Sequence, residues 1–307
     1  ELAGYSELIN RLTEQMLDGW PTNGEVDFLA ELRRLTMRLS AQMLFSTNIE
    51  GYEDSLGAAV ETIQRWGFAQ FNRPLLLPNW LPLFGQPTVR RAFALVNEQI
   101  AHFIRERRTK APQNDWLSHL LDNSDGSGLC EREIQQAAVS LFVLGYETST
   151  LALTWTGWLL ASHAEVQQRL TQVVAQVLGG RPPGFADVAQ LGCVEQTFRE
   201  ALRLYPPAYL LSREVAEEVT IGGYVLPPGS QVLLSPYLTQ HDERWFPNPE
   251  QFDPLRFSPE QEQRRPVCSW FPFGAGSRGC LGRGLALLEA THILTRLVQR
   301  FQLEPVQ

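Results

Sequence analysis

The chain has 307 residues, of which 44% are apolar and 20% charged, so it can bury a substantial core and is not a disordered chain. Lys and Arg number 26 against 34 Asp and Glu, and this net charge of −8 argues against a protein that grips nucleic-acid phosphates. The four cysteines are widely spaced without a C-x-x-C pair, which indicates neither a zinc site nor a disulfide scaffold and suits a reducing compartment.

Helical periodicity runs from the start of the chain to about residue 113. Its one interruption is residues 72–85, an apolar loop with three prolines, after which a helix is predicted over 87–108. A polar turn at 122–128 precedes a long helix over 131–163 and another over 164–178. The apolar zone 137–161 is broken by Glu147-Thr-Ser-Thr150, so we expect a buried central helix and not a membrane span.

The second half of the chain changes in texture. A helix over 188–204 stops at Tyr205-Pro-Pro207, and residues 214–234 contain short β-type runs between Gly-Gly and Pro-Pro-Gly turns. Residues 241–279 show little periodicity, and a last helix is predicted over 281–300. The sequence therefore predicts a mainly α protein with a small β region, arranged as one domain over residues 1–307.

Residues 271–282 carry the most specific chemical pattern, F-P-F-G-A-G-S-R-G-C-L-G. Cys280 stands just before the predicted last helix, whose positive end favours a thiolate. The glycines let the backbone approach a flat, bulky group. A thiolate with Arg278 two residues earlier fits a haem-iron ligand beside a propionate partner. A single cysteine is more often a small buried apolar residue, but the number of specified positions argues against that here.

This segment resembles the haem-binding loop of the cytochrome P-450 family of haem-thiolate monooxygenases. The resemblance implies the P-450 fold, a haem b cofactor (iron protoporphyrin IX) and Cys280 as the metal ligand that binds its iron. It also implies that the cofactor contacts Phe273, Gly274, Arg278 and Gly282.

Two more segments resemble landmarks of the family in the expected order. Glu200-Ala-Leu-Arg203 looks like its E-x-x-R, and residues 252–257 look like its P-x-R-F element, with Leu255 where the family has Glu. The resemblance implies a buried charge triad of Glu200, Arg203 and Arg256. Glu and Arg three residues apart do share one helix face, and a second arginine would offset the remaining charge. An isolated E-x-x-R is otherwise a solvated pair.

The long helix contains Leu144-Gly-Tyr-Glu-Thr148, which resembles the family's [A/G]-G-x-[D/E]-T with Leu144 in place of the usual small residue. The resemblance implies that Glu147 and Thr148 are the catalytic pair that delivers protons to dioxygen, with Gly145 beside the cofactor. A glycine and a hydroxyl inside a helix let it open locally. The alternative is a kink whose polar groups are satisfied within the helix.

Arg213 matches the family's arginine that pairs with a haem propionate, and a surface arginine on a strand edge is the alternative. The resemblance implies that the apolar loop Pro74–Phe84 borders the channel through which substrate enters. The alternative is that its apolar side chains only pack against the rest of the protein. The resemblance places the substrate against six side chains: Leu141, Leu144, Ala208, Tyr209, Leu210 and Leu211.

Among subgroups, residues 200–208, 234–240 and 280–289 look similar to bacterial carotenoid (β-carotene) hydroxylases. This likeness favours an isoprenoid or fatty acyl substrate, a cytoplasmic location and a monomer. About a hundred N-terminal residues of the family and its final β-hairpin have no counterpart here, so we expect a fragment, or the ordered part of a longer molecule, with a fold truncated at both ends. A membrane anchor in that N-terminal part is left open.

The leading hypothesis is a monooxygenase that inserts one atom of O2 into an apolar substrate. Its electrons would come from a separate partner, a ferredoxin or flavodoxin with its reductase, docked near Arg264, Arg265 and Arg283. The alternatives are a peroxide-driven peroxygenase and a haem- or lipid-binding module without turnover. A hydrolase that uses Cys280 is the weakest reading, because no motif places a histidine as its base.

Overall fold

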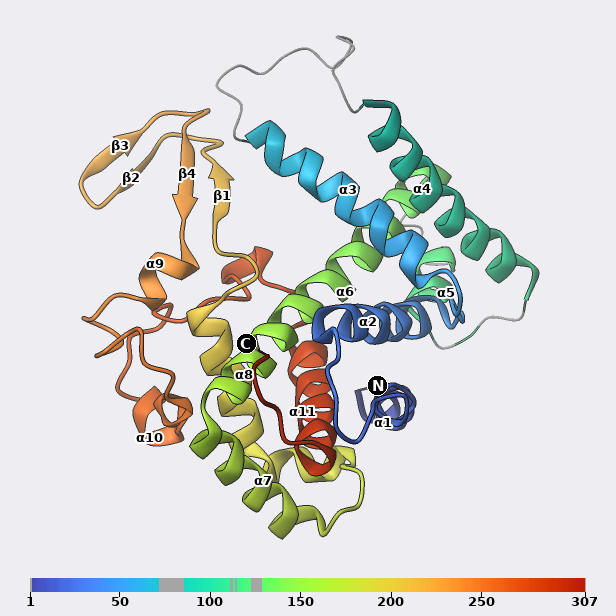
Figure 1. The fold of residues 1–307 in the computed structure, drawn as a ribbon. Helices are drawn as coiled ribbons and strands as arrows, with labels where there is room; N and C mark the ends of the chain where they lie inside the picture. Colours follow the sequence, from blue (N-terminus) through green and yellow to red (C-terminus); the bar gives the residue numbers. More distant parts are fainter. Residues whose placement is uncertain (1, 72–85, 111–112, 114, 123–128, 307) are drawn as a thin grey trace. The chain divides into compact units, whose positions relative to one another are not determined.

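The computed structural model describes residues 2–71, 86–110, 113, 115–122 and 129–306, most of them helical (Figure 1). The chain divides into two compact units, one made of residues 1–26 and 148–307 and the other of residues 27–147. Helix α6 (Glu131–Ser162) contributes to both units. The mainly helical character agrees with the prediction, and the assignment of 1–307 to one domain stays a prediction. The loop Pro74–Phe84 lies outside the described residues.

In the unit of residues 27–147, the described residues form four helices that pack with the first half of α6: α2 (Phe28–Phe45), α3 (Glu53–Phe71), α4 (Gln86–Thr109) and α5 (Trp116–Leu121). Side-chain caps begin two of them, since Asp27 accepts from the Ala30 amide (3.0 Å) and Asp115 from the Ser118 amide (2.8 Å). Its core is apolar and aromatic, with the Phe45 and Phe142 ring centroids 6.0 Å apart.

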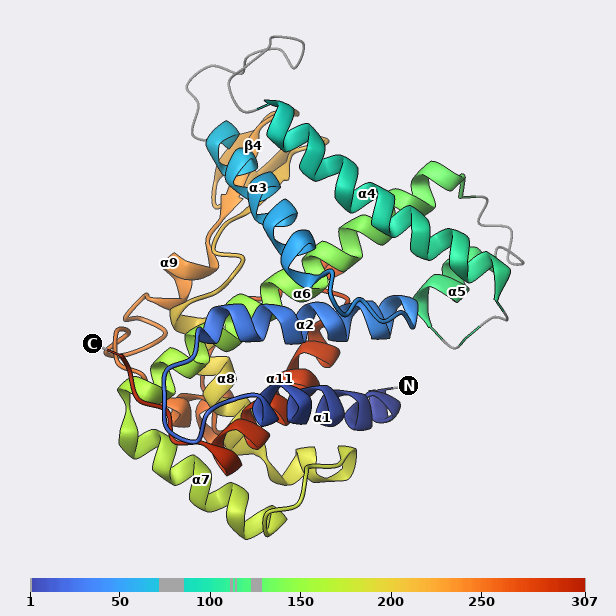
Figure 2. The ribbon, with the colours of Figure 1, turned by 45° about the vertical axis from the view of Figure 1, so that its right-hand side comes forward.

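In the other unit, helix α11 (Arg283–Arg300) contacts α1 (Leu2–Asp18), α7 (Ala164–Leu178) and α8 (Gly192–Leu204). Figure 2 shows α1 lying against α11. The predicted helix over 188–204 is in fact the 3₁₀ turn η2 (Phe185–Gln190) followed by α8. The break lies at Leu191, whose amide closes the turn by donating to the Asp187 and Val188 carbonyls (both 3.1 Å).

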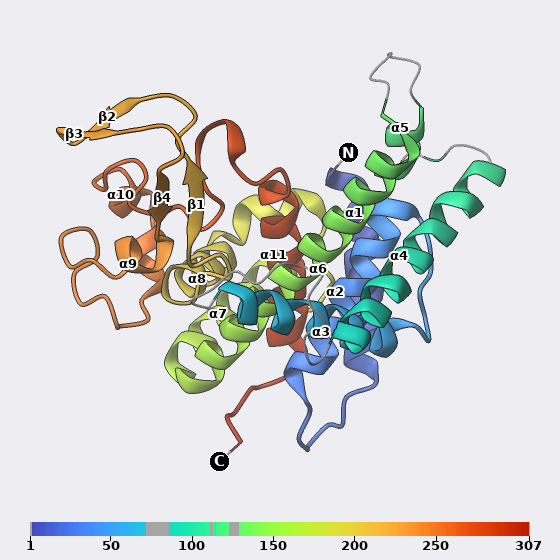
Figure 3. The same ribbon diagram turned by 90° about the horizontal axis from the view of Figure 1, so that it is seen from above.

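Two small antiparallel ladders form the β region, which lies together at one edge of this unit (Figure 3). Strand β1 (Leu211–Glu214) pairs with β4 (Gln231–Leu234), and β2 (Val219–Ile221) pairs with β3 (Tyr224–Leu226). Gly222 and Gly223, with φ of +59° and +88°, make the two-residue turn between β2 and β3. Short helical turns follow: α9 (Pro236–Gln240), η3 (Pro254–Phe257), α10 (Pro259–Glu262) and η4 (Gly276–Arg278).

Helix α6 is apolar but only partly buried. Phe142, Leu153 and Leu160 are buried, whereas Leu144 and Trp158 are exposed, so the expected burial holds for one face only. Among the described residues α6 is the one helix long and apolar enough to cross a membrane, a criterion that core helices of water-soluble proteins also meet.

Candidate haem-thiolate site

Residues 271–282, the Cys280 loop, fold back on themselves just before α11. The Gly274 amide donates to the Phe271 carbonyl (2.9 Å), and the Cys280 amide donates to the Phe273 carbonyl (2.8 Å). Gly274 has a φ of +68°, a left-handed conformation in which a Cβ is strained. A Cβ on Gly282 would stand 3.8 Å from Cys280 Sγ, at ordinary van der Waals distance from the sulfur. The loop therefore presents an exposed thiol at its end.

Two arginines lie close to this loop without a carboxylate partner. Arg278 is an exposed residue of the loop, and Arg213 is exposed on β1. Strand β1 packs on the loop, since Leu211 Cδ1 lies 3.9 Å from the position of a Cβ on Gly274. Within the described part of the chain neither arginine forms an ion pair, and Arg213 donates to the Ser212 carbonyl (2.8 Å). Both guanidinium groups are thus able to bind an added carboxylate.

These surroundings fit haem. The thiol is a soft donor for iron, the two arginines suit the propionates, and apolar side chains suit the macrocycle. Tyr209 and Leu210 are 49% and 47% exposed, and Ala208 and Leu211 are half-buried. These four predicted substrate residues are consecutive and end at the first residue of β1, Leu211, which lies beside Gly274 of the loop.

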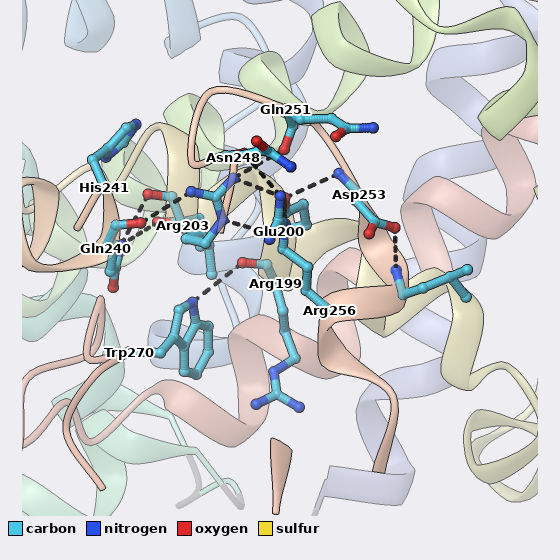
Figure 4. Close-up of polar contacts among 12 residues, drawn as sticks. Arg199, Glu200, Arg203, Gln240, His241, Asn248, Gln251, Asp253, Arg256 and Trp270 are labelled. Carbon is cyan, nitrogen blue, oxygen red and sulfur yellow. Dashed lines mark hydrogen bonds and ion pairs between the residues drawn. The ribbon is translucent and has the colours of Figure 1, made fainter. Parts of the chain in front are cut away.

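Glu200 and Arg203 form a fully buried ion pair within α8 (Figure 4). Arg203 donates through Nε to Glu200 Oε2 (2.7 Å) and through Nη2 to Oε1 (2.8 Å). Arg256 Nε lies 3.3 Å from Glu200 Oε1, to which the Asp253 amide also donates (3.0 Å). Burial raises the pKa of Glu200, and the hydrogen bonds from Arg203 oppose that rise. The structure thus brings the three residues of the predicted triad together.

Gln240 is a fully buried residue that the sequence did not single out. Its Nε2 donates to the carbonyls of Leu202 (3.0 Å) and Arg203 (3.1 Å), which end α8. Its Oε1 accepts from the amide of Phe271 (3.1 Å), where the Cys280 loop begins. One side chain therefore connects the helix of the buried ion pair to the loop that carries the thiol.

Arginine and aromatic side chains alternate beside the loop. The Arg199 guanidinium lies 4.8 Å from the Phe257 ring centroid and 4.6 Å from that of Trp270. The Arg265 guanidinium lies 4.6 Å from the Phe257 ring centroid. Its partial burial lowers the pKa of the guanidinium. Arg265 is therefore half-buried against an aromatic ring, and its part in donor docking stays a prediction. Arg264 and Arg283 are exposed.

The residues predicted on α6 fall on both sides of the division between the units. Four of them belong to the unit of residues 27–147: Leu141, Leu144, Gly145 and Glu147. Thr148 belongs to the other unit, whose second segment begins at this residue. Gly145 lets α6 approach α2, because a Cβ there would stand 3.1 Å from Ser40 Oγ. Burial raises the pKa of Glu147, while a hydrogen bond from Gln64 and the charge of Arg33 oppose the rise. A carboxyl in this setting is suited to holding a proton.

A further buried carboxyl, which sequence reasoning missed, joins α6 to α11. Ser149 Oγ donates to Glu289 Oε2 (3.1 Å), and both residues are buried. Burial raises the pKa of Glu289 to about 7, and the Ser149 hydrogen bond opposes the rise. The two residues are 140 apart in sequence, and no motif signals their contact.

Comparison with known proteins agrees with this geometry. Cyclooctatin synthase of Streptomyces melanosporofaciens is 34% identical over 99% of this chain and 68% of its own length. Cyclooctat-9-en-7-ol 5-monooxygenase of the same organism is 32% identical over 100% of this chain and 68% of its own. Pentalenene oxygenase of Streptomyces avermitilis is 29% identical, with 98% and 68% covered. This chain therefore spans about two thirds of the length of these relatives.

The fold matches a solved structure, and the sequence matches a family model. A crystal structure of the cytochrome P450DA heme domain superimposes with a TM-score of 0.85 at 24% identity, covering 96% of this chain and 66% of that one. The sequence profile of the Cytochrome P450 family matches residues 2–307. With the thiol-bearing loop, the unpaired arginines and the buried Glu200–Arg203 pair in place, this chain belongs to the cytochrome P450 family of haem-iron monooxygenases.

Proposed function

We propose that this chain forms the haem-binding part of a monooxygenase that transfers one oxygen atom of O2 to an apolar isoprenoid. The observation that carries the proposal is the exposed Cys280 thiol, held at the end of a glycine-rich loop beside the unpaired Arg213 and Arg278. Haem b, when bound, supplies the redox-active iron that activates dioxygen.

In this proposal Cys280 Sγ binds the iron as a thiolate, and Arg213 and Arg278 bind the propionates. Gln240 and the Cys280–Phe273 backbone hydrogen bond keep the sulfur in place. Phe273, Gly274 and Gly282 shape the surface of the loop, and Gly145 serves the same purpose on α6. Because the loop is braced by backbone hydrogen bonds, the thiolate keeps its orientation.

Glu147 and Thr148 deliver protons. Burial raises the pKa of Glu147 and so favours its protonated carboxyl, and the neighbouring Thr148 hydroxyl passes the proton on toward the site of dioxygen reduction. The buried Ser149–Glu289 pair lies one residue further along α6 and fixes the orientation of this turn relative to α11. A carboxyl followed by a hydroxyl can deliver the protons that the reduction of O2 requires. A peroxygenase has less need of such a pair, because the oxygen of peroxide is already reduced.

The substrate class rests on apolar side chains and on the names of relatives. Tyr209, Leu210 and Leu144 are exposed apolar residues at predicted substrate positions. Two relatives are named for an alkene, pentalenene, and an alkenol, cyclooctat-9-en-7-ol. We therefore favour a cyclic isoprenoid, with the long carotenoid chain as the second choice and a fatty acyl chain as the third.

Electrons arrive, in the same proposal, from a separate ferredoxin or flavodoxin with its reductase. The exposed Arg264 and Arg283 offer it a positively charged docking face next to the Cys280 loop. We propose a cytoplasmic monomer, in keeping with four free cysteines.

The test is the absorption spectrum of the reduced, carbon monoxide-bound protein in its full-length form. A strongly red-shifted Soret band is expected, and Cys280→Ala should abolish it because the alanine has no donor for iron. Cys130→Ala, which removes another exposed thiol, is the matched control and should keep the band.

Two results would redirect the proposal. An unshifted band in the unaltered protein, or no haem in a chain whose circular dichroism shows it folded, would favour a binding module without turnover. Equal turnover with peroxide and with O2 plus reductant would favour a peroxygenase. If the band appears, cyclic isoprenoids are titrated first, and a spectral shift on binding supports the substrate class.

A further inference from the structure

Five buried polar atoms on two facing helices lack a hydrogen-bond partner among the described residues. They are Ser6 Oγ, Asn10 Oδ1 and Thr13 Oγ1 on α1, and His292 Nε2 and Thr295 Oγ1 on α11. A buried polar atom without a partner costs about 1–3 kcal/mol, and native proteins contain few of them. Five in one helix–helix contact, here called the α1–α11 seam, therefore require an explanation.

Ion pairs at the end of the seam show which residues face each other. Arg296 of α11 pairs with Glu14 of α1, and Arg300 donates to Asp18 (2.6 Å). Each pair is 282 residues apart, so the two helices run in the same direction with a constant offset. Asn10 and His292 share that offset, as do Thr13 and Thr295.

Asn10 and His292, which share the offset of the two helices, each leave an acceptor without a partner. The Asn10 amide nitrogen donates to the Pro183 carbonyl (2.6 Å), so its oxygen is the atom left over. His292 Nδ1 lies 3.0 Å from the Leu288 carbonyl, which only accepts, so Nδ1 carries the hydrogen and Nε2 of the neutral ring is an acceptor. Burial lowers the pKa of His292, which favours the neutral ring. Two acceptors cannot bond to each other, but a molecule with two donors satisfies both.

We propose that the α1–α11 seam is a binding site for internal water, with one water donating to both Asn10 Oδ1 and His292 Nε2 and another joining the Thr13 and Thr295 hydroxyls. Water is the ligand that the chemistry selects, because it supplies two donors and two acceptors in the smallest volume. Ser6, one turn earlier on α1, gives the row of waters a further hydroxyl. These waters fasten α1 to the helix that follows Cys280.

A crystal structure of the full-length haem protein, at a resolution that defines ordered water, tests the site directly. We expect a water within about 2.7–3.2 Å of both Asn10 Oδ1 and His292 Nε2. A dry seam in which these side chains bond directly to each other, or turn to other partners, would overturn the proposal.

A double-mutant cycle tests it in solution. Thr13→Val and Thr295→Val each keep the side-chain shape and should each lower the folding equilibrium constant about tenfold. A shared water is lost with either hydroxyl, so the folding equilibrium constant of the double variant should fall far less than a hundredfold. A fall equal to the product of the two single effects would contradict a shared water.

Thr291→Val is the matched control in this cycle. Thr291 is buried on the same helix, but its hydroxyl donates to the Leu287 carbonyl (2.7 Å) and needs no water. The effects of Thr291→Val and Thr13→Val on the folding equilibrium constant should therefore be independent, so that the double variant shows their product. Coupling as strong as that of Thr295 would mean that any buried hydroxyl of α11 couples to α1, and the water site would be rejected.

Discussion

At the scale of single residues, Gln240 controls the start of the Cys280 loop. Gln240→Leu has a similar shape but leaves the Leu202 and Arg203 carbonyls and the Phe271 amide without their partner. We expect a loss of about 3 kcal/mol in the free energy of unfolding. If Gln240 positions the loop, the variant should also convert more readily from the red-shifted carbon monoxide complex to an unshifted one, which time-resolved spectra would record.

Gln251→Leu is the control for that experiment. The Gln251 side chain is exposed, and only its backbone carbonyl accepts from Arg203 (3.1 Å). The control should change neither stability nor the spectrum. If Gln240→Leu loses stability while its spectrum persists as long as that of the unaltered protein, the residue braces α8 without positioning the loop.

At the scale of elements, the burial of Glu289 where α11 meets α6 makes stability depend on pH. The pKa of Glu289 is about 7 in the folded chain against an ordinary 4.5, so the folded state holds its proton longer. This contribution is fully present below pH 4.5 and is lost as pH rises through about 7. It amounts to about 3 kcal/mol, so the unfolding free energy should fall over this range.

Urea unfolding at several pH values checks this expectation. Glu289→Gln keeps a hydrogen-bonding group but cannot ionise, so its stability relative to the unaltered protein should improve steadily between pH 5 and about 7.5. Glu218→Gln, at an exposed position, should leave the profile unchanged. Parallel pH profiles for Glu289→Gln and the unaltered protein would contradict the buried, protonated carboxyl.

Long helices with a sustained apolar periodicity could be predicted from the sequence, whereas contacts between segments distant in the sequence could not. The helix expected over 131–163 ends within one residue of α6, because a sustained apolar period marks its course. Glu200 and Arg203 were predictable as neighbours because they lie three apart on one helix. Gln240 was not, because its partners are more than 30 residues away and a five-residue helix has no period.

At the scale of the whole molecule, the Cys280 motif and its companion segments predicted the family, the helical fold, the enzyme class and the haem cofactor, and comparison with known proteins confirms them at family level. The specific likeness to carotenoid hydroxylases stays a prediction. Short motifs identify the family and its cofactor, whereas substrate choice depends on the particular side chains that line the site, which those motifs do not specify.

The charge of the whole chain bears on how an electron donor docks. With a net charge of −8 the protein repels an acidic donor at long range, so local arginines must overcome that field. Arg264→Glu combined with Arg283→Glu should raise the KM for reduced donor about tenfold at low salt and less at high salt, because salt screens exposed charges. The control is Arg169→Glu combined with Arg11→Glu, which changes the net charge equally at exposed positions on α7 and α1. An equal rise in KM for both pairs would show that net charge, and not the local charge of Arg264 and Arg283, governs docking.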